Sequence, residues 1–310
     1  MTTRPVALRV EGLTKRYGAN AAVDGVSLTV HRGEVFGFLG PNGAGKTTTL
    51  RMLLGLVAPT SGRAEVLGRP PGDPTALRRT GSLIEGPGFY PYLTGRANLR
   101  TVARYAGVPA DRVDEALASV GLGDRGADRF ATYSLGLKQR LGVAAALLKD
   151  PELVLLDEPT NGLDPQGMRE MRTLVVDLGR QGRTVVLSSH LLAEVQQVCG
   201  RVAVIDRGRI VREGTVEELR GEAELEILAT PSDTALARLR ALPCIEQVRR
   251  VDGALLAKAA TRHTAEINRA LVEAGVAVTG LRRAERALED VFFDLTDHET
   301  EHDTKEASHV

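Results

Sequence analysis

The fold of this chain is decided by one stretch, Gly40-Pro41-Asn42-Gly43-Ala44-Gly45-Lys46-Thr47. This stretch fits the phosphate-loop pattern G-x-x-x-x-G-K-[ST], and it lies between a run at 34–39 that predicts a strand and a run at 48–54 that predicts a helix. Its glycines permit backbone angles at which consecutive N–H groups, and the positive end of the following helix, face one anion. We therefore expect Lys46 to reach the β- and γ-phosphates of a nucleotide, and the Thr47 hydroxyl to hold Mg²⁺.

Length and composition limit the class of protein. The chain has 310 residues, 43% of them hydrophobic, with 40 basic and 40 acidic residues. This length suits one large domain or two smaller ones, and the balanced charge argues against a nucleic-acid partner bound through bulk charge. Cys199 and Cys244 lie far apart and outside any C-x-x-C pair, so the sequence suggests neither a zinc site nor a disulfide framework. No run approaches the roughly 18 apolar residues of a membrane span, and the N-terminus lacks the apolar core of a signal peptide, so we expect the chain by itself to be soluble and cytoplasmic.

The pattern along the first two thirds of the chain is that of an α/β domain. An exposed turn is expected at 14–18, and a mostly helical insertion over about 86–150. Strands are predicted at 6–10, 22–30, 63–68, 81–85, 153–157, 184–188, 202–206 and 209–213. Helices are predicted at 112–120, 137–148, 167–181 and 191–199.

From about residue 222 the pattern changes. Strands at 222–229, 245–251, 254–259 and 276–281 alternate with helices at 233–242 and 264–274, which gives the order β-α-β-β-α-β of a ferredoxin-like domain. A last helix is expected at 288–295, which completes a C-terminal domain over 222–296. Residues 297–310 are polar and are expected to be a disordered tail.

Several polar residues lie where the predicted elements end. Asp157 closes a buried strand and is placed to hold Mg²⁺, and Glu158 can orient or deprotonate a water that attacks the γ-phosphate. His190 follows the next strand and could sense that phosphate, although a histidine there is more often structural. Ser134 and Gly136 open a helix, where an anion site is one interpretation and an ordinary helix cap is the other.

These motifs, in this order over about residues 6–220, resemble those of the ATP-binding cassette (ABC) ATPases. Tyr133-Ser134-Leu135-Gly136-Leu137 matches the signature that is usually L-S-G-G-Q, and 153–158 matches Walker B. Asn161-Gly162-Leu163-Asp164 matches the D-loop, and His190 matches the switch histidine.

The resemblance implies the α/β fold of a P-loop NTPase over 5–220, with ATP and Mg²⁺ as cofactors and ATP hydrolysis as the activity. Glu158, His190 and Lys46 are then the catalytic residues. In this family two cassettes sandwich two ATP molecules, and the Ser134 and Gly136 equivalents of one subunit reach the γ-phosphate bound by the other, which implies a homodimer. The implied nucleotide-binding residues are Tyr17, Gly40, Asn42, Gly43, Gly45, Lys46, Thr47, Thr48, Ser134 and Gly136.

Within that set, Tyr17 falls where the family stacks an aromatic ring on adenine, whereas its local sequence alone favours an ordinary half-buried tyrosine. The chain departs from the family pattern at two places. Leu135 and Leu137 replace the usual Gly and Gln of the signature. Glu85 stands where the family has a glutamine; a carboxylate there can ligate Mg²⁺ with Thr47 and Asp157, but it adds a negative charge and removes an N–H donor.

The stretch 84–96 and the C-terminal region are similar to those of the bacitracin- and daunorubicin-type exporters. That similarity implies a separate membrane permease of the ABC-2 class, a location at the cytoplasmic face of the cell membrane, and export of a drug or antibiotic. Phe89 and Tyr90 are candidates for contact with the permease, and packing within the helical insertion is the competing explanation. Two alternative functions are a non-transport ABC ATPase with a regulatory role and a P-loop kinase, the latter disfavoured by the signature and the Asp157-Glu158 pair.

Overall fold

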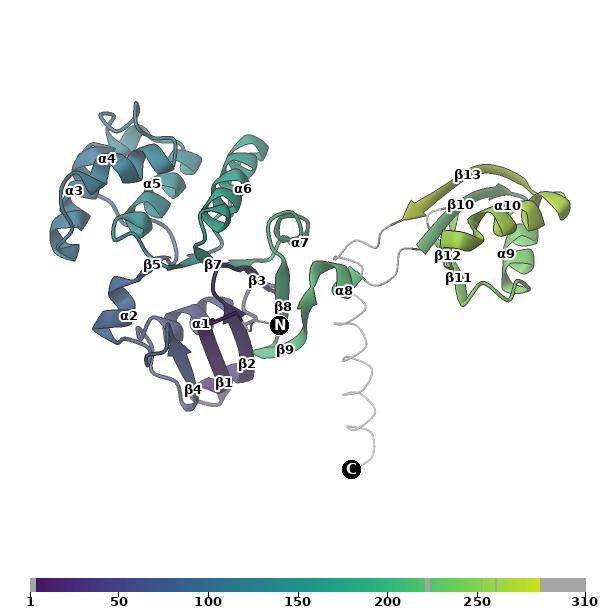
Figure 1. The fold of residues 1–310 in the computed structure, drawn as a ribbon, viewed down its shortest axis with the longest axis horizontal. Helices are drawn as coiled ribbons and strands as arrows, with labels where there is room; N and C mark the ends of the chain where they lie inside the picture. Colours follow the sequence, from purple (N-terminus) through teal and green to yellow (C-terminus); the bar gives the residue numbers. More distant parts are fainter. Residues whose placement is uncertain (1–3, 221–223, 252, 260, 285–310) are drawn as a thin grey trace. The chain divides into compact units, whose positions relative to one another are not determined.

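The computed structural model describes residues 4–220, 224–251, 253–259 and 261–284. The chain divides into two compact units, residues 1–216 and 217–310 (Figure 1). Each unit has its own hydrophobic core, so each is described separately.

A six-stranded sheet with the strand order β5-β6-β7-β3-β8-β9 forms the centre of the first unit. Its pairs are parallel except for the edge pair of β8 with β9. The strands are β3 (Val35–Leu39), β5 (Thr80–Leu83), β6 (Leu153–Asp157), β7 (Thr184–Ser189), β8 (Arg201–Asp206) and β9 (Arg209–Thr215). Every residue of β6 and β7 is buried, as expected for apolar strands covered on both faces.

The register of the three neighbouring strands β6, β7 and β3 positions the site. Asp157 pairs with Ser188, and Leu39, the residue before the phosphate loop, pairs with Ser189. Because carboxyl ends of parallel strands meet at one edge of a sheet, the phosphate loop and the Asp157-Glu158 pair emerge side by side.

A second, antiparallel sheet of three strands, β2-β1-β4, packs near the first. It consists of β1 (Val6–Tyr17), β2 (Asn20–His31) and β4 (Ser61–Val66). One core cluster joins residues of both sheets with the helix α1 (Lys46–Leu53), including Leu8, Phe38 and Leu50. The exposed turn expected at 14–18 is confined to Gly18 and Ala19, because β1 continues to Tyr17, which pairs with Asn20 of β2. Register shifts after Val10 and Leu13 break the strict alternation by which a strand is recognised.

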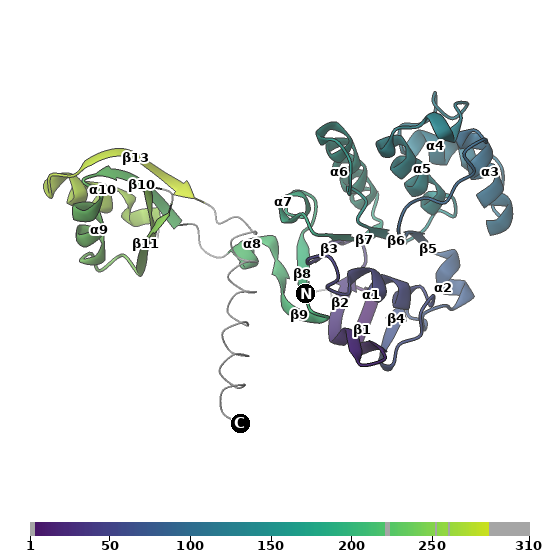
Figure 2. The same cartoon turned by 180° about the vertical axis from the view of Figure 1, so that it is seen from behind.

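The predicted helical insertion contains three α-helices and a 3₁₀ turn. They are α3 (Gly95–Ala106), α4 (Arg112–Ser119), η1 (Phe130–Thr132) and α5 (Leu135–Leu147). The three α-helices, α3, α4 and α5, lie together in both views (Figures 1 and 2). The other helices of the unit are α2 (Pro74–Arg78), α6 (Pro165–Arg180) and α7 (Leu192–Val195). The helix expected at 191–199 is shorter, because after Val195 the backbone N–H groups of Gln197 and Val198 bond three residues back rather than four.

The boundary between the units falls within the short helix α8 (Val216–Arg220), which the sequence pattern did not predict. The four-stranded antiparallel sheet of the second unit has the order β11-β12-β10-β13. The chain order is β10 (Glu224–Thr230), α9 (Ser232–Arg240), β11 (Gln247–Val251), β12 (Ala254–Lys258), η2 (Thr261–His263), α10 (Thr264–Glu273) and β13 (Ala277–Ala284). Buried residues of α9 and α10 share one core with Leu225, Ile227 and Leu255, so both helices cover the same face of this sheet. The helix expected at 288–295 and the tail at 297–310 lie outside the described residues.

Candidate functional site

The phosphate loop follows β3 and leads into α1, as its sequence pattern requires. Gly45 caps α1 with a left-handed φ of 106°, and a Cβ there would lie 2.4 Å from the Ala22 carbonyl oxygen. At Gly40 a Cβ would lie 2.2 Å from the Ile205 carbonyl oxygen. No side chain fits at either contact, so only glycine permits the loop to pack this closely against β8 and β2.

Lys46 is only 5% exposed, and its ammonium group has three neighbours. Lys46 Nζ donates to the carbonyl oxygens of Gly40, at 2.7 Å, and Pro41, at 3.0 Å. It also lies 3.1 Å from Glu158 Oε1, as an ion pair without hydrogen-bond geometry. The carbonyl groups of the loop therefore hold the Lys46 ammonium group beside the Glu158 carboxylate.

Asp157 and Glu158 are tied to separate partners. Thr47 Oγ1 donates to Asp157 Oδ2 at 2.7 Å, and Ser188 Oγ donates to Asp157 Oδ1 at 2.5 Å. The same Ser188 hydroxyl accepts from the Glu158 backbone N–H at 2.9 Å. Ser188 is fully buried, so its hydroxyl fixes both acidic residues relative to β7.

Glu158 adopts a left-handed φ of 48°, which turns the chain sharply after β6. Its Oε2 is 2.8 Å from His190 Nδ1. A carboxylate can only accept, so His190 carries its proton on Nδ1 and donates it to this contact. Glu158 therefore links His190, at the end of β7, to Lys46, in the phosphate loop, through one hydrogen bond and one ion pair.

A cavity of 160 Å³, here called the phosphate-loop cavity, opens between these groups. It is lined by Ala22, Asn42, Gly43, Gly45, Lys46, Thr47, Thr48 and Glu158. Backbone N–H groups at a helix start and a lysine suit phosphate oxygens, and the hydroxyl and carboxylate oxygens of Thr47 and Asp157 suit Mg²⁺. The chemistry of the donor set therefore fits a nucleotide with its magnesium ion.

Ser134 and Gly136 line a different cavity of 440 Å³, here called the signature cavity. It lies between the start of α5 and the start of α6, and its lining includes Gly162 and Asp164 but no residue of the phosphate loop. Ser134 Oγ caps α5 by accepting from Leu137 N at 3.3 Å, and Asp164 Oδ1 caps α6 by accepting from Gly167 N at 2.7 Å. Two helix starts at one cavity present positive dipole ends to whatever anion enters it.

Two further predicted site residues lie at the surface, outside the lining of either cavity. Tyr17, at the end of β1, is 53% exposed, and Lys15 Nζ lies 5.1 Å from its ring centre. Glu85 follows β5 with a left-handed φ of 64°, and its side chain, 64% exposed, pairs with Arg51 of α1. The ion pair offsets the charge that a carboxylate brings to this position.

Ser188 and Arg51 are the residues that the sequence analysis missed. A small polar residue near the end of a buried apolar strand is the signal that could have revealed Ser188. Arg51 gives no such signal, since a basic residue in the last turn of a helix is ordinary.

The site combines a phosphate loop whose close packing requires glycine, a lysine in that loop, and a hydrogen bond from Thr47 to Asp157 at the end of β6. These features define a P-loop nucleotide-binding protein. The family model described as "ABC transporter" matches residues 23–161. The bacitracin transport ATP-binding protein BcrA of Bacillus licheniformis is 40% identical over 295 residues, which cover 93% of this chain and 96% of that protein. The chain therefore belongs to the ATP-binding proteins of ABC transporters and is an ABC transporter ATPase, for which ATP binding is a family property.

Two other comparisons agree with this membership. A fluoroquinolones export ATP-binding protein of Mycobacterium tuberculosis is 45% identical over 218 residues, 69% of this chain and 72% of that protein. A solved ATP-binding subunit of an ABC transporter superposes with a TM-score of 0.61 and 30% identity, covering 69% of this chain and 92% of that structure. Among the described residues, every helix is too short or too polar to cross a bilayer.

Proposed function

We propose that this chain hydrolyses ATP in a homodimer of cassettes and thereby drives a separate ABC-2 permease that exports a drug or antibiotic. Two sets of contacts carry the catalytic part of this proposal. In the first, Glu158 contacts both His190 and Lys46. In the second, Asp157 accepts hydrogen bonds from both Thr47 and Ser188. The export part rests on the relatives, whose names record bacitracin transport and fluoroquinolone export.

The polar groups in and beside the phosphate-loop cavity each have a part in this reaction. Lys46 and the backbone of Gly40, Asn42, Gly43, Gly45, Thr47 and Thr48 hold the phosphates of ATP, and Thr47 with Asp157 ligates Mg²⁺. When bound, Mg²⁺ offsets charge on the phosphate oxygens. Glu158 Oε2 is engaged by His190, and Oε1 faces Lys46 Nζ at 3.1 Å. When Lys46 turns to the phosphates of ATP, Oε1 becomes free to orient the attacking water and accept its proton. His190 thus acts mainly by holding the base.

The signature cavity supplies the argument for a dimer. Ser134 and Gly136 sit at a helix start with anion-binding chemistry, yet they line a cavity that shares no residue with the phosphate loop. A second copy of the chain, bound head to tail, would bring each signature cavity to the other copy's γ-phosphate. Tyr17, exposed at the end of β1, is placed as the residue that stacks on adenine. Glu85 remains a proposed magnesium ligand, and its carboxylate must first break the ion pair with Arg51 to bind the ion.

The geometry of the helical insertion indicates which of its aromatic residues can contact the permease. Phe89 packs edge-on against Phe130, with ring centres 5.3 Å apart, which supports a structural role. Tyr90 is 48% exposed and Tyr92 is 70% exposed, with ring centres 5.7 Å apart. We assign the contact with the permease to this tyrosine pair, and we place the chain at the cytoplasmic face of the membrane through that contact.

The remaining domain assignments complete the proposal. The cassette spans 5–220, with its helical subdomain at about 86–150, and the accessory domain spans 222–296. The order β10-α9-β11-β12-α10-β13 with two helices on one sheet face supports a ferredoxin-like fold for this accessory domain.

Affinity purification of the full chain from membranes of its own cells tests the export proposal. The expected result is recovery in the membrane fraction together with a multi-spanning polypeptide, and loss of that recovery on replacing Tyr90 and Tyr92 with Ala. Deletion of the gene should then raise sensitivity to at least one antibiotic. Recovery from the soluble fraction without such a partner would instead support the regulatory, non-transport ATPase.

A further inference from the structure

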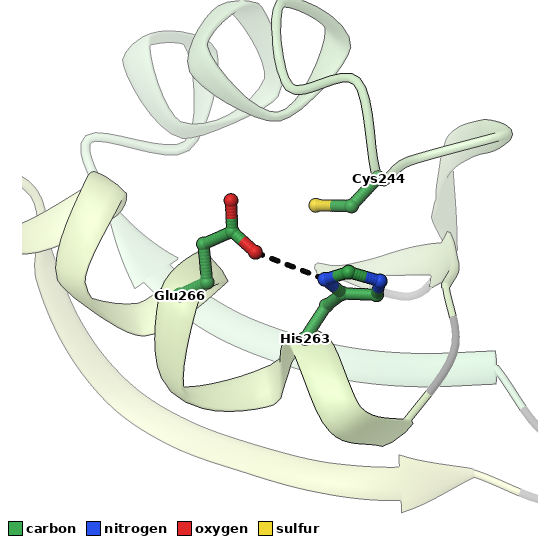
Figure 3. A group of neighbouring side chains, drawn as sticks. All are labelled: Cys244, His263 and Glu266. Carbon is green, nitrogen blue, oxygen red and sulfur yellow. Dashed lines mark hydrogen bonds and ion pairs between the residues drawn. The ribbon is translucent and has the colours of Figure 1, made fainter.

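In the second unit, three side chains with metal-binding chemistry meet beside the first turn of α10 (Figure 3). Cys244 comes from the loop between α9 and β11, His263 from the end of η2, and Glu266 from the first turn of α10. One ligand atom of each, namely the thiol sulfur, a ring nitrogen and a carboxylate oxygen, all lie within 4.8 Å of one another. Cys244 and His263 are half-buried, and Glu266 is exposed.

The spacing is close to what one tetrahedral ion requires. Zinc bonds of about 2.0–2.3 Å at tetrahedral angles put ligand atoms about 3.3–3.6 Å apart. His263 Nδ1 and Glu266 Oε2 are 2.9 Å apart, so this pair would open slightly. The sulfur lies within 4.8 Å of the other two ligand atoms, so it would close by little more than about an ångström at most. Rotation of the exposed Glu266 side chain and of the Cys244 side chain, which lies in a loop, can supply this change.

We propose that Cys244, His263 and Glu266 bind one Zn²⁺ ion, with a water molecule in the fourth position. A thiolate combined with an imidazole and a carboxylate favours zinc over Mg²⁺ or Ca²⁺, which prefer oxygen ligands alone. Three protein ligands leave one position open, so the ion exchanges more readily than in a closed four-ligand site. This site is separate from the phosphate-loop cavity, whose donor set suits magnesium.

Binding of a cation requires one change in the contacts around the cluster. Arg262 Nε donates to His263 Nε2 at 3.2 Å. A metal on Nδ1 leaves the proton of a neutral imidazole on Nε2, so the exposed Arg262 side chain must turn into solvent, at the cost of one surface hydrogen bond.

Without a metal, the cluster contributes little. His263 and Glu266 form a partly exposed pair three residues apart, and such pairs stabilise weakly. With zinc, the turn after α9 is joined to the start of α10, so the ion links the two segments that cover one face of the sheet. Because the ligands meet only in the folded chain, binding stabilises the folded state.

Metal titration of the nucleotide-free full chain, after treatment with a chelator, tests the site. The expected result is one Zn²⁺ per chain, a rise in the melting temperature, and a thiolate-to-metal charge-transfer band with tetrahedral visible bands when Co²⁺ is used. Cys244→Ser should abolish the charge-transfer band and weaken zinc binding about a hundredfold, while Cys199→Ala should leave both unchanged. Glu266→Gln should weaken binding, and the exposed Glu273→Gln on the same helix should not.

His263→Gln gives an independent measurement should Cys244→Ser fold poorly, because His263 lies at the surface end of η2. Loss of cobalt bands in this variant, with unchanged ATP hydrolysis, would support the site. No zinc retained by the wild-type chain against a chelator of micromolar affinity would overturn it. Equal zinc affinity in the wild type and in all three ligand variants would overturn it as well.

Discussion

The phosphate-loop cavity and the signature cavity of the first unit are built on different principles. Around the phosphate-loop cavity, charged side chains from β6, β7 and the loop bond directly to one another, from His190 through Glu158 to Lys46. At the signature cavity the charged residues of the lining are held by the two helices: Arg140 of α5 pairs with Glu170 of α6 at 2.8 Å, and Asp164 caps α6. The first cavity is equipped for chemistry, and the second offers neutral donors and helix dipoles to an anion.

This difference gives different expectations for substitutions. Removing a charged group from the phosphate-loop cavity should change the rate of hydrolysis in every assembly state. Removing a donor from the signature cavity should matter only where a second copy supplies the phosphate. The following predictions test that division, beginning with the largest effect.

Glu158→Gln should lower the rate of ATP hydrolysis about 10²–10⁴-fold, the range for loss of a general base. Gln is nearly isosteric and can still accept from His190, so ATP binding should remain. The variant should accumulate as an ATP-bound dimer, which size-exclusion chromatography with ATP and Mg²⁺ would detect. Glu65→Gln, at an exposed position of β4, is the control and should hydrolyse ATP at the wild-type rate. A wild-type rate in Glu158→Gln would show that Glu158 is not the general base. The proposed difference between the two cavities would then be wrong as well.

Ser188→Ala should lower the rate about tenfold to a hundredfold. The substitution removes the donor to Asp157 Oδ1 and an acceptor of the Glu158 N–H in a fully buried position, a loss of about 1–3 kcal/mol. Steady-state hydrolysis over a range of Mg²⁺ concentrations should show the lost rate together with a higher magnesium requirement.

Thr184→Ala is the matched control for Ser188→Ala. Thr184 is also a buried hydroxyl of β7, and it accepts from the Gly33 N–H at 3.0 Å at the other end of the strand. Thermal unfolding should therefore show a comparable loss of stability in both variants. If both also lost the same hydrolytic activity, Ser188 would be a structural residue and not a positioning residue of the site.

Whether the sequence predicts a feature depends on how far apart along the chain the interacting residues lie. The phosphate loop and the buried strand ending in Asp157-Glu158 are local patterns, and the structure has both elements in the predicted places. Ser188 was missed because its role depends on the register between β6 and β7, which local periodicity does not reveal. The Thr14–Tyr17 part of β1 was misread because register shifts obscure a strand whose pairing partners lie elsewhere in the chain. The cluster of Cys244 with His263 and Glu266 likewise requires two segments that only the fold brings together.

Ser134→Ala should lower hydrolysis about tenfold at protein concentrations that permit dimers, because it removes one hydrogen bond to a charged group, about 1.5–3 kcal/mol when formed. ATP binding by the single chain should not change. Loss of the cap on α5 should also cost about 1 kcal/mol of stability. The measurement is hydrolysis as a function of protein concentration, alongside nucleotide binding to the diluted chain.

Thr94→Ala separates the two consequences of the Ser134 substitution. Thr94 caps α3 in the same way, accepting from Ala97 N at 3.1 Å, and it lies outside the lining of either cavity. It should lose the same stability and keep the wild-type rate. An equal rate in Ser134→Ala and Thr94→Ala would mean that the signature cavity contributes only a helix cap, and the head-to-tail dimer would lose its support.

Glu85→Gln is expected to have the smallest effect, within about tenfold of the wild-type rate, or about 1.4 kcal/mol in the barrier. An amide oxygen can replace a carboxylate oxygen at magnesium, and the ion pair with Arg51 that is lost is exposed and therefore weak. Arg51→Gln leaves the Glu85 carboxylate without this partner, so it should lower the rate more than Glu85→Gln if excess negative charge near magnesium is what Arg51 offsets. Complete loss of hydrolysis in Glu85→Gln would instead place Glu85 among the charged groups on which the phosphate-loop cavity depends.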